Sequence, residues 1–279
     1  MKLIRFGKKG EEKPGVVVNK HQLDCSAHFE DWNRSFFQNG GVEKLKKVLA
    51  ENTLPVVDEN ERWGSPIARP GMIACIGLNY SDHAKEAGMA LPEEPIVFMK
   101  AANTIGGPYD AVAIPKDSKT TDWEVELGIV LGQDVSYLED EKAAEAAIAG
   151  YCVVNDVSER IFQLRRGGQW TKGKSCPGFC PTGPYLVTKE AIEDIHNLKM
   201  TLSVNGQLMQ NGTTHNMIFK PAYIVWYLSQ FMQLEAGDLI STGTPAGVGS
   251  GRNPRIFLKK GDKVVLGIEG LGEQQLSFV

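Results

Sequence analysis

Two glutamates lie two positions apart in the apolar stretch at residues 123–127, whose sequence is WEVEL. Alternate side chains of a β-strand point to the same face, so Glu124 and Glu126 would project side by side while the apolar residues pack behind them. Two carboxylates this close repel each other unless protons, a cationic side chain or a metal ion compensate their charge. The alternative is an exposed strand face that carries two acids.

A third acid, Asp156, directly follows the apolar run at residues 151–155, where the end of a strand would deliver its side chain to a site. Three carboxylates without neighbouring cysteine or histidine pairs suit a hard divalent ion, whereas zinc usually takes nitrogen and sulfur ligands. We therefore predict one Mg²⁺ or Mn²⁺ ion bound by Glu124, Glu126 and Asp156. Replacing Glu124 with glutamine is expected to abolish activity and, by relieving repulsion, to leave the ion-free fold intact or more stable.

His83 and Glu86 lie three positions apart in a short helix that the sequence predicts from Ser81, a suitable N-cap, to Gly88. This spacing puts both side chains on one helical face, where a carboxylate can orient an imidazole and raise its basicity. A solvated helix face is the alternative interpretation. The position of the pair, directly after a predicted buried strand, makes it the candidate for general base chemistry.

A glycine-rich loop at residues 241–249, with the sequence STGTPAGVG, follows another predicted strand. It contains neither the P-loop pattern nor a GxGxxG turn that opens a helix, so neither phosphate-binding motif applies. The loop is either a tight turn or a segment whose backbone amides and threonine hydroxyls hold a carboxylate or an oxyanion. The chain has no GxSxG elbow, so serine hydrolase chemistry has no candidate nucleophile.

The elements that must position these residues are short strands with a few helices. Glycine makes up 30 of the 279 residues and falls between short apolar runs, which favours a sheet-rich fold. Asn205 and Gly206 form a strong hairpin signal. A polar segment at residues 58–70 indicates a junction between a small N-terminal α+β domain (1–65) and a larger domain (66–279). The pattern predicts strands at 2–6, 15–19, 72–78, 96–100, 111–114, 123–131, 151–154, 238–241 and 263–268, and helices at 42–52, 139–149 and 221–231, the last with Ile224, Tyr227, Leu228 and Phe231 facing inward.

Composition excludes several classes of protein. The net charge is 30 − 34 = −4 without a basic block, which argues against a nucleic-acid partner. The longest apolar runs are far shorter than the ~20 residues that cross a bilayer, and the N-terminus lacks the apolar core of an export signal. Five cysteines without CxxC spacing are typical of a reduced, cytoplasmic protein.

In combination, these segments resemble the fumarylacetoacetate hydrolase family. The similarity rests on ordered motifs from residue 72 to about residue 268, each of which is ordinary alone. These are IGLNY followed by DHA and Glu86, the DWEVEL strand, NDVS at 155–158, GKS at 173–175, the Gly183–Pro184 pair, and TGTPAGVG at 242–249. One departure follows Lys174, where Ser175 precedes Cys-Pro-Gly instead of the family's usual residues.

The resemblance implies an α+β fold, with a mixed β-roll catalytic domain behind the small N-terminal domain, in a homodimer or larger homo-oligomer. The family's metal carboxylates correspond to Glu124, Glu126 and Asp156, and its water-activating pair corresponds to His83 and Glu86. Its active-site lysine corresponds to Lys174. Its substrate contacts correspond to Arg160, Gln163, Thr244 and Tyr80.

The activity that the resemblance implies is metal-dependent hydrolysis of the carbon–carbon bond of a 2,4-dioxo acid to pyruvate and a carboxylic acid. Residues 158–163, 165–168 and 270–273 look like a bacterial subgroup whose labels name 2,4-diketo-3-deoxy sugar acids, such as the L-fuconate and rhamnonate derivatives, or ureidoglycolate. The alternatives are therefore an oxaloacetate decarboxylase or tautomerase and a ureidoglycolate lyase with the same site. A scaffold without catalysis is disfavoured, because every candidate site residue is present.

Overall fold

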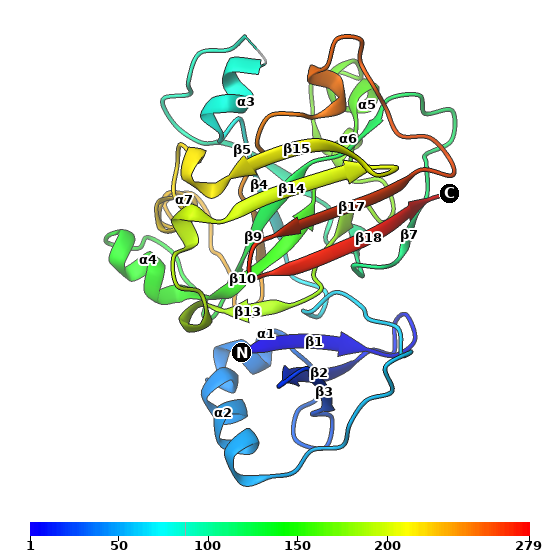
Figure 1. Ribbon diagram of the computed structural model, residues 1–279. Coiled ribbons are helices and arrows are strands. Elements are labelled where there is room, and N and C mark those ends of the chain that lie inside the picture. Colours follow the sequence, from blue (N-terminus) through cyan, green and yellow to red (C-terminus); the bar gives the residue numbers. More distant parts are fainter. Residues whose placement is uncertain (87) are drawn as a thin grey trace.

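The computed structural model describes residues 1–86 and 88–279, which form a small lower unit and a larger upper unit (Figure 1). The small unit contains three strands and two helices. Asn33 caps the first helix by accepting a hydrogen bond from the Phe36 amide. The elements of this unit are β1 (Lys2–Phe6), β2 (Lys13–Val18), β3 (His21–Asp24), α1 (Arg34–Gln38) and α2 (Gly41–Glu51).

One mixed nine-stranded sheet runs through both units in the order β3-β2-β1-β13-β10-β9-β16-β4-β5. The three N-terminal strands join the larger unit through β1, which pairs antiparallel with β13. The two units therefore share one sheet, and the domain boundary at residue 65 stays a prediction. The strands of the larger unit in this sheet are β4 (Ile73–Gly77), β5 (Ile96–Lys100), β9 (Val125–Leu131), β10 (Ile148–Asn155), β13 (Leu186–Thr188) and β16 (Leu239–Ser241).

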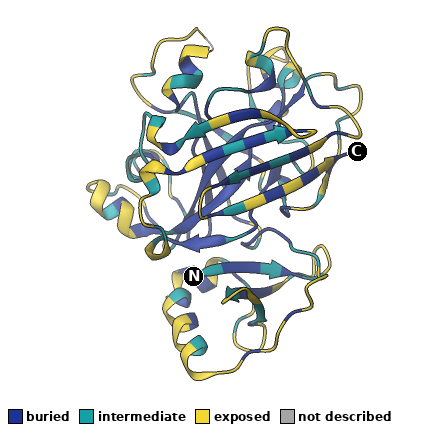
Figure 2. Cartoon of the chain, viewed as in Figure 1, coloured by how far each residue is buried: buried dark blue, intermediate teal, exposed yellow. Residues whose placement is uncertain are grey.

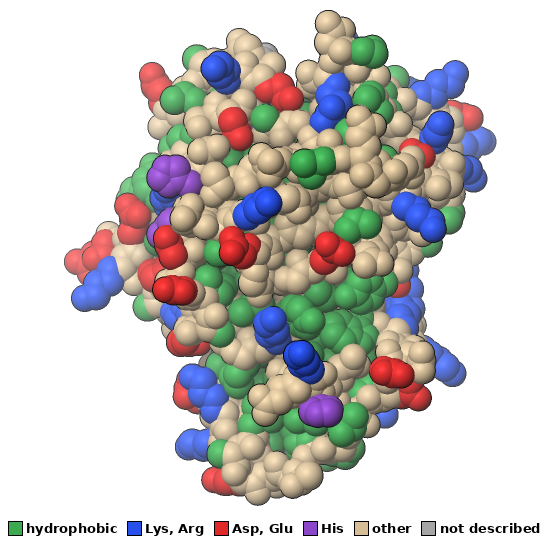
Figure 3. Space-filling model, viewed as in Figure 1, with side chains coloured by type: hydrophobic (Ala, Val, Ile, Leu, Met, Phe, Trp, Pro, Cys, Tyr) green, Lys and Arg blue, Asp and Glu red, His purple; other side chains and the backbone are tan. Residues whose placement is uncertain are grey.

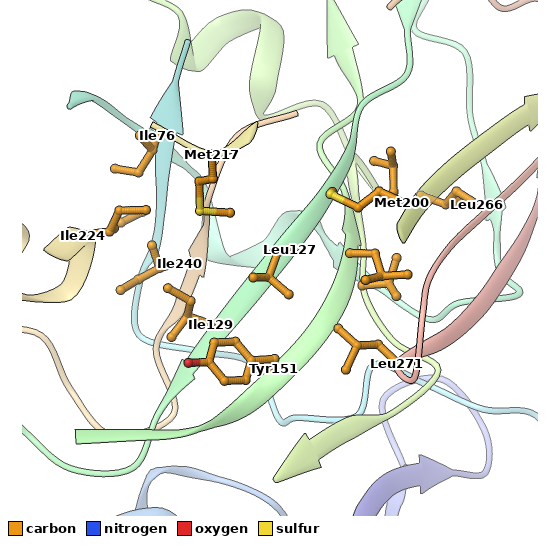
Figure 4. Packing of buried hydrophobic residues seen from close by; sticks show 14 of the residues in the cluster. Ile76, Leu127, Ile129, Tyr151, Met200, Met217, Ile224, Ile240, Leu266 and Leu271 are labelled. Atoms are coloured by element: carbon orange, nitrogen blue, oxygen red, sulfur yellow. The ribbon is translucent and has the colours of Figure 1, made fainter. Parts of the chain in front are cut away.

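A second sheet of five strands packs on the first and closes the hydrophobic core between them. Its three inner strands alternate buried residues with more exposed ones, as expected for a sheet with one wet face, whereas β9 of the first sheet is buried throughout (Figure 2). Figure 4 shows Leu127 of the first sheet between Ile240 of the same sheet and Met200 of the second. The second sheet consists of β15 (Gln207–Thr213), β14 (Lys199–Val204), β17 (Lys263–Ile268), β18 (Gly272–Phe278) and β7 (Ala111–Val112).

Short helices and two small strand pairs complete the larger unit. Helix α4 packs against α7, and Asp140 caps α4 by accepting a hydrogen bond from the Ala143 amide. The α-helices are α3 (Ser81–Glu86), α4 (Glu141–Ala147), α5 (Arg160–Leu164), α6 (Thr171–Lys174) and α7 (Pro221–Ser229). The strand pairs are β8 (Thr121–Asp122) with β11 (Ser158–Glu159), and β6 (Ile105–Gly106) with β12 (Cys180–Pro181), and the 3₁₀ turns are η1 (Ala102–Thr104), η2 (Lys189–Ala191), η3 (Ile195–Asn197), η4 (Thr214–Asn216) and η5 (Gly249–Gly251).

The mixed α+β fold expected from the sequence is confirmed, and three predicted strands match the observed bounds: 2–6, 96–100 and 263–268. Asn205 and Gly206 adopt positive φ angles of 51° and 79° in the turn between β14 and β15, as the hairpin signal predicted. Strands β3, β13 and β18 were not predicted. Their polar or very short sequences give little period-2 signal.

The inward face predicted for helix 221–231 is partly wrong. Helix α7 ends at Ser229, so Phe231 lies beyond the helix and is 64% exposed. Val225 is buried in its place, while Ile224 and Leu228 face the core as expected. The helix is apolar nearly all round, and such a sequence does not define which side faces the core.

The surface mixes charges of both signs. On the face in Figure 3, acidic and basic side chains are interspersed, and hydrophobic side chains gather where the small unit meets the larger one. Among the helices of residues 1–86 and 88–279, none has the length and apolar character needed to cross a membrane.

Candidate active site

The three predicted carboxylates meet at one end of two inner strands of the large sheet, β9 and β10. Strands β9 and β10 pair with Glu126 opposite Val154, and the Asp156 amide donates to the Glu124 carbonyl oxygen at 3.0 Å. This register places the start of β9 beside the end of β10. One carboxylate oxygen from each of Glu124, Glu126 and Asp156 lies within 4.8 Å of the other two, and all three residues are buried. The strand pattern therefore put both glutamates on the correct face.

Three cationic side chains surround this cluster. Lys174 Nζ donates to Glu124 Oε2 at 2.7 Å and to Asp156 Oδ2 at 2.6 Å. Arg160 binds the other oxygen of Glu124 at 2.7 Å. Burial alone would raise the pKa of Glu124, but the charges of Lys174 and Arg160 lower it to about 2. Lys100 Nζ binds Asp156 Oδ1 at 2.5 Å.

Glu126 differs from its two neighbours because its bonds come from neutral groups. Its Oε2 accepts hydrogen bonds from the Ser241 hydroxyl at 2.6 Å and the Gly243 amide at 2.9 Å. Burial, and then the charges of Asp156 and Glu124, raise the pKa of Glu126 well above its ordinary value. A buried carboxylate beside two others is the environment that a divalent cation relieves, so the donor set fits Mg²⁺ or Mn²⁺.

The charges correct one expectation about stability. Relief of repulsion was assigned to Glu124, but Glu124 is held between the cations of Lys174 and Arg160. Removing its charge would leave those cations undercompensated in a buried site, which is destabilising. The carboxylate whose charge is repelled is Glu126.

Replacing Glu126 with glutamine is therefore expected to stabilise the ion-free protein. The pKa of Glu126 is raised in the folded state. The wild-type protein therefore loses stability as the pH rises from the ordinary carboxyl range through the raised pKa of Glu126. Glutamine lacks this titration. Thermal melts of EDTA-treated protein between pH 4 and pH 8 should show similar Tm values at the acid end and a variant Tm higher by about 5 °C at the alkaline end. Parallel curves would contradict the charge assignment.

His83 and Glu86 form the predicted pair on α3. The distance from His83 Nδ1 to Glu86 Oε2 is 3.2 Å, and the Gly247 amide donates to both oxygens of Glu86 at 3.0 and 3.1 Å. Burial would raise the pKa of Glu86, but the hydrogen bonds from His83 and Gly247 lower it. Glu86 thus stays charged and orients the imidazole, which leaves the other ring nitrogen available as a base.

The backbone amides of the glycine-rich loop bind carboxylates, which was one of the two interpretations of its sequence. The carboxylates that they bind are side chains of this protein. The amide of Gly243 binds Glu126, and the amide of Gly247 binds Glu86. Both glycines have positive φ angles, 98° and 107°. A β-carbon on Gly247 would lie 2.2 Å from the Met209 carbonyl oxygen, so glycine is required there.

A cavity of about 180 Å³ brings most candidate residues together. Glu124, Glu126, Lys174 and His83 line it, and Ile76, Phe98 and Trp170 form its apolar wall. Arg160, Gln163 and Thr244 also line it. The Thr244 hydroxyl donates to the Val125 carbonyl and accepts from Gln210, so its side chain is fixed in place.

Two candidates, Asp156 and Glu86, do not line this cavity: Asp156 is fully buried against Lys174, and Glu86 lines a second cavity. Tyr80 does not reach the cavity either. Its side chain is fully buried in the hydrophobic core, and its hydroxyl donates to Met200 Sδ at 3.1 Å. Tyr80 was proposed from its place in a motif, which carries no information about where the side chain points. In this structure it supports the segment that leads into α3.

Two site residues were missed. Lys100 ends the apolar strand β5, is fully buried, and binds both Asp156 and the Val157 carbonyl oxygen. Asp122 accepts hydrogen bonds from the Gly249 and Ser250 amides and pairs with Arg160 at 2.7 Å. A lysine that closes an otherwise apolar strand was a signal for Lys100, because such a charge needs a partner when buried. Asp122 stands directly before the WEVEL stretch.

Comparisons with known proteins show which family this chain resembles in sequence and in fold. The model of the fumarylacetoacetate (FAA) hydrolase C-terminal family matches residues 72–279. A protein of Burkholderia ambifaria named "Putative hydrolase" is 49% identical over 276 residues, covering 98% of this chain and 97% of that protein. The fumarylacetoacetate hydrolase of Exiguobacterium antarcticum superposes with a TM-score of 0.87 at 33% identity, covering 100% and 99% of the two chains. A "probable 2-hydroxyhepta-2,4-diene-1,7-dioate isomerase" of Mycobacterium abscessus superposes at 0.82 with 30% identity, covering 100% and 98%.

Proposed function

Because the chain belongs to the fumarylacetoacetate hydrolase family, we propose that it hydrolyses the carbon–carbon bond of a 2,4-dioxo acid to give pyruvate and a carboxylic acid. One observation carries the proposal. Two members of a buried set of three carboxylates line the same cavity as a lysine and a carboxylate-oriented histidine. This combination offers a place for an electrophilic cation, a cationic hydrogen-bond donor and a base.

The residues that would hold a divalent ion, Mg²⁺ or Mn²⁺, are Glu124, Glu126 and Asp156. When bound, the ion would act as a Lewis acid that polarises the 2-oxo end of the substrate. Lys100 restrains Asp156, and Arg160 restrains Glu124, each through an ion pair. Such outer contacts orient ligand carboxylates and tune their affinity for a metal.

His83 takes a proton from a water molecule at the ring nitrogen that does not face Glu86. The resulting hydroxide attacks C4 of the substrate, and the C3–C4 bond then breaks with its electron pair passing to the pyruvate enolate. Lys174 stabilises the negative charge that develops on the enolate oxygen. Burial alone would lower the pKa of Lys174, but the charges of Asp156 and Glu124 raise it above its ordinary value, so the side chain stays protonated. The proton held by His83 returns to C3, which balances the reaction. Arg160 and Gln163, which also line the cavity, contact the substrate.

A second candidate is isomerase or decarboxylase chemistry at the same site. The similarity to an isomerase over the whole chain favours it. Keto–enol transfer and loss of CO₂ from oxaloacetate both use an enolate held beside a cation, and neither needs an attacking water. Release of urea from ureidoglycolate is the third possibility for this site, and a 2,4-diketo-3-deoxy sugar acid is one candidate dioxo substrate.

Purified protein incubated with Mg²⁺ or Mn²⁺ should release pyruvate from a 2,4-dioxo acid such as acetylpyruvate. EDTA treatment should stop the reaction and added ion should restore it, because the carboxylates alone cannot polarise the substrate. The other substrates to be tested are a 2,4-diketo-3-deoxy sugar acid, oxaloacetate and ureidoglycolate. The products measured are pyruvate from the dioxo acids, CO₂ from oxaloacetate and glyoxylate from ureidoglycolate. CO₂ from oxaloacetate, or glyoxylate from ureidoglycolate, without cleavage of any dioxo acid would replace the hydrolase proposal.

The proposal includes a cytoplasmic homodimer. All five cysteines are free thiols, as a reducing compartment would keep them. Hydrophobic side chains gather on the face shown in Figure 3. Exposed hydrophobic patches commonly form protein–protein interfaces, and we propose that a second copy of the chain covers this one.

A further inference from the structure

A second cavity of about 730 Å³ adjoins the reaction cavity on the His83 side. His83, Arg160, Leu164 and Ser250 line both spaces, so the two cavities are neighbours. One wall of the second cavity is the segment that follows the glycine-rich loop, including η5. The opposite wall is the end of α5.

The walls of this cavity carry an excess of positive charge. Arg252 and Arg255 come from the loop side, and Arg165 comes from the end of α5. Glu86 is the acid on these walls, and it is already bound by His83 and Gly247. Among the residues that the structure describes, no carboxylate forms an ion pair with these three arginines.

Arg252 is held in position yet retains unused donors. One terminal nitrogen donates to the Met209 carbonyl oxygen at 2.6 Å, which fixes the half-buried side chain against β15. Its Nε is buried and, within the described part of the chain, meets no hydrogen-bond acceptor. A buried donor without a partner is costly, and guanidinium groups match carboxylates with two parallel hydrogen bonds. Arg255 lies three residues further along, exposed on the same wall.

We propose that this arginine-lined cavity binds a carboxylate at the far end of the substrate, so that the substrate is a 2,4-dioxo diacid. The inference rests on the proposed hydrolysis, in which one end of the substrate lies at the carboxylate cluster and His83 acts at C4. The arm beyond C4 then extends past His83 into the second cavity. A sugar-derived arm with only hydroxyl groups would offer these guanidinium groups no carboxylate for charge-assisted hydrogen bonds.

The test uses two substrates with arms of equal size, 2,4-dioxoheptanedioate and its 7-amide, which differ only in the terminal charge. Wild-type enzyme should cleave the diacid with a kcat/KM about 100-fold higher, mainly through a lower KM, because charge-assisted bonds form with the bound substrate throughout. Arg252→Met and Arg255→Met should each lower this diacid-to-amide ratio by about 10-fold or more. Arg255 is exposed, so its variant keeps the test valid if Arg252→Met folds poorly.

Lys47→Met is the matched control, since Lys47 is exposed on α2 and its loss changes the net charge equally. The ratio should stay at the wild-type value in that variant. Equal kcat/KM for the two substrates, or a ratio unchanged in both arginine variants, would overturn this inference while leaving the proposed hydrolysis intact. Failure to release pyruvate from either substrate would overturn the inference, and failure with acetylpyruvate as well would overturn the proposed hydrolysis.

Discussion

Replacing Glu124 with glutamine is expected to lower kcat/KM for the dioxo acid to below about 1% of the wild-type value and also to destabilise the ion-free protein. The substitution removes a charged oxygen from the proposed ion site and the partner of both Lys174 and Arg160. Breaking a buried ion pair by removing one partner typically costs about 3–5 kcal/mol. Activity is measured over a titration of Mg²⁺ and Mn²⁺, and stability by urea unfolding after EDTA treatment.

Glu126→Gln is the matched control, because it makes the same chemical change two residues away on the same strand face. It should lose activity to a similar extent, yet gain stability in the ion-free state. Wild-type turnover in Glu124→Gln, or in EDTA-treated enzyme, would refute the metal site. A change of stability in the same direction in both variants would refute the assignment of charge within the cluster.

Replacing His83 with alanine should reduce hydrolysis of the dioxo acid by about 10²–10⁴-fold, the usual effect of losing a general base. Oxaloacetate decarboxylation, if the protein has it, should fall much less, because that reaction needs no activated water. Both rates are measured on the same preparation. His215→Ala, at an exposed position on η4, controls for loss of a histidine elsewhere.

If His83→Ala cleaves the dioxo acid within a few-fold of wild type, water activation by this residue is refuted. An isomerase or decarboxylase would then describe the site better. Glu86→Gln should give a smaller loss than His83→Ala, since the amide oxygen can still accept a hydrogen bond from the imidazole and keep it oriented.

The sequence predicted those parts of the site that depend on local geometry. Glu124 and Glu126 share a strand face because of a two-residue period, and His83 and Glu86 share a helical face because of a three-residue spacing. Asp156 could be placed because it ends an apolar run. Each prediction needed only the residues within one element, and the structure places all five as expected.

The missed features depend on contacts between distant segments. Lys100 meets Asp156 across 56 positions, and Lys174 meets Glu124 across 50, so neither ion pair has a local signal. Because the ion pairs of Glu124 could not be predicted, the expectation that Glu124→Gln would relieve repulsion was wrong. Tyr80 shows the complementary limit, since the order of motifs locates a segment but does not say which of its side chains faces the cavity.

The pairing of β1 with β13 bears on how far the N-terminal unit can act as a separable module. Leu3 lies opposite Leu186 in this pairing, and Arg62 also joins Asp110 of the larger unit at 2.6 Å. A fragment that began at residue 66 would present β13 to water as an unpaired edge, which invites strand exchange and aggregation. The first 65 residues thus protect the edge of the sheet whose other strands carry the carboxylates.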